Sequence, residues 1–249
     1  MSHPAIQVEQ LTKSYRTGAV TTPVLRDVSL TATPGECLFL AGPSGSGKTT
    51  LLSILGCVLS ADSGRVRLLG EDVSRMRPRD LVRFRRERIG FVFQRFHLFE
   101  GLEAWENVRL PCDLLGIPRR DGREQAMQLL QLVGLADRAH HRISQLSMGQ
   151  RQRVALARAL AGGPELILAD EPTASLDADS GAVAMHLLKE LCSGLRKTVV
   201  VVTHDNRIFS FADRMLMLVD GRIAKETVHR RADEAQAETP AEYAGVGAA

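Results

Sequence analysis

The chain has 249 residues, of which 44% are hydrophobic and 24% charged, and its 32 basic and 29 acidic side chains give a formal charge of +3. This length and hydrophobic content suit a folded protein with a sizeable core and exclude a chain disordered throughout. A charge of +3 is too small to indicate nucleic acid or an acidic membrane surface as a partner. No apolar run approaches the roughly 20 residues of a spanning helix, and the first ten residues lack the features of a signal peptide, so we expect a cytoplasmic location.

Short apolar runs that favour strands alternate with helical patterns along the chain. In chain order these runs cover residues 6–11, 37–41, 166–169, 199–202 and 215–219. The runs at 166–169 and 199–202 are continuously apolar, which is typical of parallel strands covered by helices on both faces. The sequence therefore predicts an α/β fold that binds its ligand at the carboxyl ends of the strands.

Arginines are concentrated between residues 75 and 88, which raises nucleic-acid binding as a hypothesis. Asp80, Glu87 and the apolar Leu81, Val82 and Phe84 are interleaved with these arginines. This mixture is more typical of a solvated amphipathic helix, so we expect no nucleic-acid partner.

Strand signals fade between residues 94 and 161, where apolar positions at helical spacing and strong helix formers predict helices over 121–133 and 148–161. We expect residues 94–161 to form a helical subdomain inserted into a discontinuous core made of residues 1–93 and 162–226. Residues 227–249 are polar, rich in alanine and glycine and without sustained periodicity, which predicts a flexible tail.

The four cysteines stand singly in mainly apolar stretches: Cys37, Cys57, Cys112 and Cys192. They show neither the paired spacing of a metal site nor the dense pattern of a disulfide framework. We therefore expect buried, reduced thiols.

The segment after the predicted strand 37–41 matches the phosphate-loop pattern G-x-x-x-x-G-K-[ST]. Glycines let such a loop curl so that backbone N–H groups point at phosphate oxygens, and the next helix adds the positive end of its dipole. We expect Lys48 to reach the β- and γ-phosphates of a nucleotide and Thr49 to bind Mg²⁺. The candidate phosphate-binding residues are Gly42, Pro43, Ser44, Gly45, Ser46, Gly47, Lys48, Thr49 and Thr50.

Two carboxylates follow the predicted strand 166–169. Asp170 fits a metal-binding role, and Glu171 is placed to polarise an attacking water or to accept its proton. An Asp-Glu-Pro sequence by itself is equally consistent with a turn. The phosphate loop earlier in the chain favours the catalytic interpretation.

A Ser-x-x-Gln pattern, Ser147 to Gln150, precedes the predicted helix 148–161. Locally this is a capping box, which satisfies the first N–H groups of a helix. A helix N-terminus with a hydroxyl and a nearby glycine, here Gly149, can also bind an anion.

These motifs are followed by Asp177 and then by Thr203-His204-Asp205 after a β-branched strand. In this order they resemble the nucleotide-binding subunit of an ABC transporter, and the resemblance covers roughly residues 6–226. It implies a P-loop NTPase (RecA-like) core with an antiparallel β subdomain and a helical insert, and it implies ATP and Mg²⁺ as cofactors. In this family Gln94 would form the Q-loop and residues 146–150 the signature.

The resemblance also implies a role for each matching residue. Catalytic roles fall to Glu171, His204, Gln94 and Lys48, and metal contacts to Thr49, Gln94 and Asp170. Nucleotide contacts beyond the phosphate loop fall to Tyr15, Ser147, Gly149, Gln150 and Asp177. Tyr15 would stack on adenine, and the alternative for Tyr15 is an ordinary half-buried strand residue.

The family assembles as a head-to-tail homodimer in which two ATP molecules lie between the phosphate loop of one subunit and the signature of the other. The resemblance therefore implies this dimer, separate membrane permease chains and, often, an adaptor protein in the periplasm. The ATPase would lie on the inner face of the cell membrane, held there by the permease.

Residues 88–99 and 105–111 resemble the branch that serves lipoprotein-releasing and macrolide-exporting permeases. Within it, residues 202–213 are most similar to the heterocyst glycolipid exporter type. We therefore expect an ATPase that powers export or extraction of a lipid, lipoprotein or drug-like substrate. An importer ATPase and a non-transport soluble ATPase remain the alternatives.

Two details concern residues near the predicted site. Met148 stands where the family's signature usually has glycine. Methionine would be strained there if the backbone needs a positive φ and would strengthen the helix if the backbone is helical, and we expect it to be tolerated. Phe91 and Phe93 alternate like buried strand residues, whereas Phe96 and Phe99 are candidates for an apolar socket that receives the permease.

Overall fold

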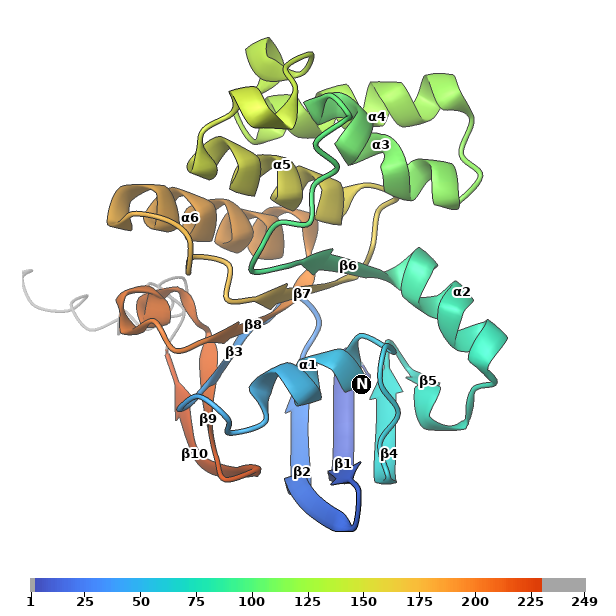
Figure 1. Cartoon of the computed structure of the whole chain (residues 1–249), viewed down its shortest axis with the longest axis vertical. Coiled ribbons are helices and arrows are strands. Elements are labelled where there is room, and N and C mark those ends of the chain that lie inside the picture. The colour runs from blue at the N-terminus through green and yellow to red at the C-terminus, as the bar shows by residue number, and fades with distance from the viewer. Residues whose placement is uncertain (1–2, 230–249) are drawn as a thin grey trace, which may run out of the picture.

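The computed structural model describes residues 3–229, apart from four side chains between residues 191 and 195. A parallel sheet lies at the centre, with a group of helices on one side and a smaller antiparallel sheet on the other (Figure 1). The antiparallel sheet has the strand order β2-β1-β4-β5. Its strands are β1 (Ile6–Thr17), β2 (Val20–Ala32), β4 (Ser63–Leu68) and β5 (Glu71–Asp72).

The central sheet has the strand order β10-β9-β3-β8-β7-β6. Its strands are β3 (Cys37–Ala41), β6 (Ile89–Val92), β7 (Leu166–Asp170), β8 (Thr198–Thr203), β9 (Arg214–Val219) and β10 (Arg222–Val228). All neighbouring pairs are parallel except β9 with β10. The α/β class and the five predicted strands are therefore confirmed.

The last strand extends into a segment that the sequence analysis assigned to the tail. β10 contains Thr227 and Val228, because the antiparallel pairing with β9 continues to Arg214 at the start of β9. Residues 230–249, on which the rest of the tail prediction falls, lie outside the described residues.

Alternate side chains of the buried strands enter two different cores. On one face of β3, Leu38 and Leu40 pack with α1 (Lys48–Leu55), which lies between the two sheets. On the other face, Phe39 packs with residues of α5 (Met148–Leu160) and α6 (Ala178–Leu195). Burial on both faces explains why these strands are continuously apolar in the sequence.

The helical subdomain has its own core around Trp105, Val108 and Leu130. It contains α3 (Ala104–Leu114), α4 (Arg119–Leu132) and α5, with the short 3-10 helices η2 (Ala136–Arg138) and η3 (Ile143–Gln145). Figure 1 shows α3, α4 and α5 grouped together, away from β1, β2 and β4. Both helices predicted in this region are present, each within two residues of its expected bounds.

The arginine-rich segment folds as α2 (Pro78–Arg88), which follows η1 (Val73–Arg75) and leads into β6. Phe84 is its buried residue, and the side chain of Arg83 is exposed, so the predicted amphipathic helix is confirmed. A further 3-10 helix, η4 (Asn206–Phe211), joins β8 to β9. Among the described residues, no helix is both long and apolar enough to cross a membrane.

Three of the cysteines are free and buried, as predicted: Cys37, Cys57 and Cys112. Burial raises the pKa of the Cys57 thiol to about 11, so this thiol is protonated at neutral pH. The side chain of Cys192 lies outside the described part of the chain.

Candidate active site

A cavity of about 770 Å³ opens at the carboxyl ends of the parallel strands. The loop after β3, the end of β7 and the segments after β6 and β8 all contribute to it. This is the edge at which parallel sheets bind ligands. The lining residues are Tyr15, Val24, Pro43, Ser44, Gly45, Gly47, Lys48, Thr49, Thr50, Gln94, Asp170, Glu171 and His204.

The loop between β3 and α1 is curled by glycines in left-handed conformations. The φ angles of Gly42, Gly45 and Gly47 are 149°, 80° and 103°. A Cβ atom on Gly42 would lie 2.1 Å from the Leu218 carbonyl oxygen, so the loop approaches β9 more closely than any side chain permits. Gly47 caps α1 in the left-handed conformation and starts the helix at Lys48.

The polar atoms inside this loop fit an anion. The Lys48 Nζ atom donates hydrogen bonds to the carbonyl oxygens of Gly42 and Pro43, each at 2.8 Å. Burial lowers the pKa of Lys48, and the carboxylates of Glu171 and Asp170 oppose that shift. The Ser46 hydroxyl is buried and has no hydrogen-bond partner among the described residues. A phosphate oxygen in the cavity could accept a further hydrogen bond from the Lys48 ammonium, which has three N–H donors.

The two predicted carboxylates face the loop from the end of β7. The Thr49 hydroxyl lies 3.5 Å from Oδ1 of Asp170, so two oxygen ligands of the kind that Mg²⁺ prefers lie side by side. Burial, and secondarily the neighbouring Glu171 carboxylate, raise the pKa of Asp170. A bound cation would stabilise the ionised form of Asp170 and remove this penalty.

Glu171 and His204 form a pair at the mouth of the cavity. The His204 Nδ1 atom lies 2.7 Å from Oε1 of Glu171. Glu171 has a left-handed backbone with φ of 47°, and its N–H donates to the carbonyl of Val202 in β8. This left-handed backbone conformation is uncommon in residues other than glycine. It directs the Glu171 carboxylate out of the β7 ladder and toward His204.

Tyr15 and Gln94 border the cavity from two further elements. Tyr15 lies on β1 with 44% of its surface exposed, and its hydroxyl is 3.5 Å from that of Thr50. An exposed ring beside the phosphate loop is available for stacking on a planar group. Gln94 lies in the turn that follows β6.

Six predicted site residues do not line this cavity: Gly42 and Ser46 of the phosphate loop, and Ser147, Gly149, Gln150 and Asp177. Ser147, Gly149 and Gln150 form the first turn of α5, where Ser147 and Gln150 make the predicted capping box. Asp177 caps α6 through the Ser180 N–H at 2.8 Å. A Cβ atom on Gly149 would lie 3.0 Å from the Ser180 hydroxyl, so these two helix starts meet each other. The chain therefore holds its predicted site residues in two separate places.

Sequence reasoning missed two residues that shape the site. Val24 lines the cavity from β2, where it belongs to an alternating strand that carries no motif. Gly221 donates from its N–H to the Ser46 carbonyl at 3.1 Å and so ties the phosphate loop to the β9–β10 hairpin. The Asp-Gly pair at 220–221 is a hairpin signal, but nothing in it indicates which loop it touches.

The interpretation of the four phenylalanines was wrong in two places. Phe96 is 7% exposed and belongs to the core beneath α5 and α6, so it is no surface socket. Phe93, which was expected to be buried, is 39% exposed because β6 ends at Val92. Phe99 is 59% exposed, as a surface contact requires.

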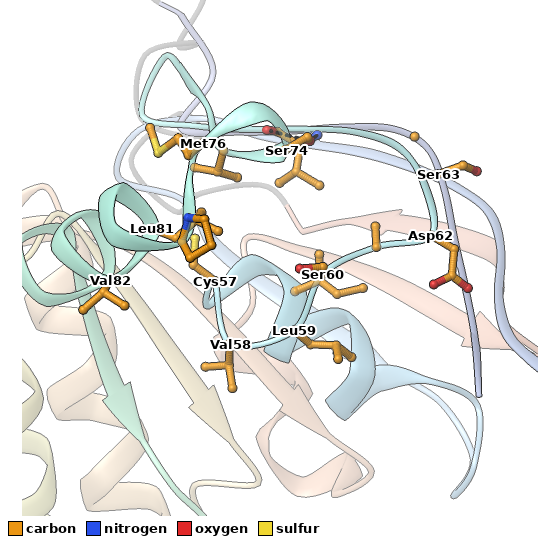
Figure 2. A pocket seen from close by; sticks show the side chains of 16 residues that line it. Cys57, Val58, Leu59, Ser60, Asp62, Ser63, Ser74, Met76, Leu81 and Val82 are labelled. Carbon is orange, nitrogen blue, oxygen red and sulfur yellow. Dashed lines mark hydrogen bonds between the residues drawn. The ribbon is translucent and has the colours of Figure 1, made fainter. Parts of the chain in front are cut away.

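A second cavity, of about 460 Å³, lies at the other end of α1 (Figure 2). Figure 2 shows Asp62 and Ser63 at one end of it and Val82 at the other. Its carboxylate, Asp62, already accepts hydrogen bonds from Lys13 and from the Ser14 N–H. Its thiol, Cys57, is protonated at neutral pH and is therefore not a nucleophilic thiolate.

The sequence pattern of the ABC transporter family matches residues 25–174 of the chain. The chain therefore belongs to the ABC transporter family. This membership accounts for a phosphate loop and two carboxylates at one edge of a parallel sheet.

Two curated relatives are similar to nearly the whole chain. The chain is 45% identical to the macrolide export ATP-binding/permease protein MacB of Burkholderia thailandensis, over 95% of this chain and 36% of that protein. The MacB protein of Vibrio parahaemolyticus is likewise 45% identical, over 96% of this chain and 37% of its own length. The chain thus spans little more than a third of the curated relatives that it matches.

Solved structures agree with the fold. The dimeric structure of MJ0796, a bacterial ABC transporter cassette, has a TM-score of 0.82 at 41% identity and covers 91% of this chain and 99% of its own. A second MJ0796 dimer, in a post-hydrolysis state bound to ADP and Pi, has the same TM-score at 40% identity, with the same coverage. The cbiO1 protein of Clostridium perfringens, part of the transporter complex cbiONQ, has a TM-score of 0.82 at 27% identity, over 95% of this chain and 92% of its own.

Proposed function

We propose that the chain binds ATP with Mg²⁺ in the 770 Å³ cavity and hydrolyses it to drive a membrane permease. The observation that carries this proposal is the convergence of Lys48, Asp170 and Glu171 on one curled glycine loop. The loop residues 42–50 would hold the triphosphate through their N–H groups and the Lys48 ammonium. Thr49 and Asp170, together with Gln94, would hold Mg²⁺, which neutralises charge on the phosphates when bound.

Glu171 is the proposed base for the attacking water. Its carboxylate lies beside His204, which would orient it and contact the γ-phosphate or the water. The chemistry asked of the protein is mainly the positioning of the water and the stabilisation of charge. Tyr15 would stack on the adenine from β1.

The signature residues need a second copy of the chain. Ser147, Gly149 and Gln150 lie outside the cavity that the phosphate loop lines. In a head-to-tail homodimer, the first turn of α5 from one subunit, together with Asp177, would complete the ATP site of the other. Ser147 and the α5 N-terminus would then supply donors to the γ-phosphate, so that ATP holds the dimer together.

Glu171→Gln tests the ATPase proposal and the dimer together. Removal of the base should slow ATP hydrolysis by about 100-fold or more, while ATP binding and the fold remain. The variant should therefore accumulate as an ATP-bound dimer in size-exclusion chromatography with light scattering. Glu124→Gln, the same exchange on an exposed position of α4, serves as the control and should behave like the unmodified chain. Near-normal turnover of Glu171→Gln would remove Glu171 from its proposed role.

A permease on separate chains is the proposed partner, and the inner face of the cell membrane is the proposed location. The two MacB relatives are named ATP-binding/permease proteins, and this chain matches about a third of each. Their names, which specify macrolide export, support export of a drug-like substrate. Export or extraction of a lipid or a lipoprotein stays a prediction from the sequence. The finer resemblance to the heterocyst glycolipid exporter type and the periplasmic adaptor stay predictions.

Phe99 offers a direct test of the permease contact. Phe99→Asp places a charge on an exposed aromatic position near the Q-loop, so the permease should no longer co-purify from detergent-solubilised membranes, whereas ATP binding stays intact. Leu132→Asp, at an exposed apolar position at the end of α4, is the matched control and should retain the permease. Retention by Phe99→Asp would contradict the proposed contact. Recovery of a many-helix permease with a solute-binding protein would indicate an importer instead.

A further inference from the structure

The turn that carries Gln94 contains two strained residues in succession. The Phe96 N–H donates to the Phe93 carbonyl at 3.0 Å, which places Gln94 and Arg95 at the centre of a β-turn. Phe96 and His97, the next two residues, have φ angles of 57° and 48°. Non-glycine residues in this left-handed region persist only where surrounding contacts hold them.

One side chain of α5 supplies two hydrogen bonds to these residues. The Arg158 guanidinium donates from Nη2 to the Phe96 carbonyl and from Nη1 to the His97 carbonyl, both at 2.5 Å. The planar guanidinium holds its two donor nitrogens in a fixed geometry that matches the two carbonyls, whereas an ammonium offers all its donors from one nitrogen atom. Burial removes water from the guanidinium and thereby lowers the pKa of Arg158. The two hydrogen bonds offset the free-energy cost of this desolvation.

The same helix also holds the turn by packing. Phe96 is buried in the core that includes Ala155, Leu156 and Ala159 of α5. The turn is therefore anchored to α5 through its backbone and through an aromatic side chain at once. Phe93 and Phe99, which flank the turn, remain exposed.

We propose that Arg158 is a positioning residue for ATP hydrolysis. It holds the 93–97 turn in the conformation that presents Gln94 to the nucleotide cavity, and it ties Gln94 to the helix that begins at the signature residues Ser147 and Gly149. This inference rests on the proposed ATPase function. Arg158 lies near the C-terminal end of α5 and does not line the cavity, so its proposed effect on ATP hydrolysis is indirect.

The geometry of α5 explains how such a link works. The helix is continuous from Met148 to Leu160, so its first turn and Arg158 lie about 15 Å apart along one rigid axis. A displacement of α5 caused by contact between the signature and a partner-bound ATP would therefore move the Phe96 and His97 carbonyls as well. Gln94 would shift with them, because it belongs to the same short turn, which the Phe96 N–H to Phe93 carbonyl hydrogen bond closes.

Arg158→Met and Arg158→Lys test the proposal, with Arg153→Met as the matched control. Arg153 also lies on α5 and donates to two backbone carbonyls, those of Val133 and Gly134, at the end of α4 rather than in the Q-loop. We expect kcat for ATP hydrolysis by the full chain to fall about tenfold in Arg158→Met, with KM for ATP within about twofold of the unmodified value. Arg158→Lys keeps the charge but not the fork, and should show a loss in the same direction. Arg153→Met should leave kcat within about twofold.

A double-mutant cycle with Gln94→Ala separates positioning from stability. If Arg158 acts through Gln94, Arg158→Lys should lower kcat in the unmodified chain and have no further effect in Gln94→Ala. Independent losses in the two backgrounds, an equal loss in Arg153→Met, or normal kcat in Gln94→Ala would overturn the proposal. Thermal unfolding midpoints identify any variant that fails to fold, and Arg158→Lys then carries the test. Hydrolysis by the unmodified chain reports on the ATPase function independently.

Discussion

At the scale of single residues, the phosphate loop depends on one position where no side chain fits. Gly42 has a φ angle of 149°, and a Cβ atom there would lie 2.1 Å from a backbone oxygen of β9. Gly45, three residues later, has a positive φ of 80°, but a Cβ there meets nothing within 4 Å. At both positions a residue with a side chain would strain the backbone, but the space around the two positions differs.

This difference gives a prediction. Gly42→Ala should lower the free energy of unfolding by at least about 2 kcal/mol more than Gly45→Ala, because the loop must leave β9 to admit the methyl group. ATP binding should weaken in parallel, since the loop N–H groups lose their common direction. Denaturant unfolding and equilibrium ATP titration of both variants measure these effects. If the free energy of unfolding fell equally in the two variants, the cost would come from backbone strain and not from the contact between a Cβ at position 42 and β9.

Residue identities in the cavity were predictable from the sequence because their signals are local. Residues 42–50 and the pair Asp170-Glu171 are contiguous, and each directly follows an apolar strand. The environment of Phe96 was not predictable, because it depends on two left-handed residues and on an arginine 62 positions later. Sequence periodicity cannot describe a segment whose backbone leaves the strand and reverses.

At the scale of elements, the N-terminus of α5 accommodates the unusual signature residue. Met148 is the first residue of the helix, its φ is not positive, and its side chain is 47% exposed. Glycine at this position therefore has no conformational advantage, and the capping box between Ser147 and Gln150 is present with methionine in place.

Met148→Gly should accordingly change the ATPase rate of the assembled complex by less than tenfold, a bound of about 1.4 kcal/mol in activation free energy. Stability should fall slightly, because glycine loses more conformational freedom than methionine on entering a helix. Steady-state ATPase assays at saturating ATP measure the rate, and Met127→Gly on α4 reports the cost of the same exchange away from the signature. A rise of tenfold or more in Met148→Gly would mean that methionine obstructs the γ-phosphate site.

The elements themselves were predictable where burial imposes a pattern. The central parallel strands are covered on both faces and read as apolar runs. β2 and β10 are largely exposed, so their residues alternate or vary without a clear period, and neither was expected from the residues alone. The antiparallel sheet came from the family resemblance, because its pairing joins residues far apart in sequence such as Thr12 and Ser63.

At the scale of the whole molecule, the residues of the proposed ATP site lie on two separate surfaces of the chain. The phosphate loop, the carboxylates and His204 surround one cavity, and the start of α5 lies elsewhere beside α6. In the proposed dimer, a twofold axis would place each surface against the other, so that both sites would be completed at once. The related MJ0796 cassette is itself a dimer in its solved structures.

Complementation between two inactive variants tests this division. Lys48→Ala removes the phosphate-loop lysine, and Ser147→Arg blocks the signature, so each variant alone should be inactive in both of its sites. In a mixed dimer, the intact phosphate loop of Ser147→Arg faces the intact signature of Lys48→Ala, and this one site is complete. Random pairing makes half of the dimers mixed, with one working site of two, so co-expression should restore about a quarter of the unmodified ATPase rate. A chain that carries both substitutions, paired with Lys48→Ala, contains no complete site and should restore nothing, and activity in that control would show that Lys48→Ala does not inactivate its own site. Absence of activity in the mixture of Lys48→Ala and Ser147→Arg would place the signature and the phosphate loop of each site on the same chain.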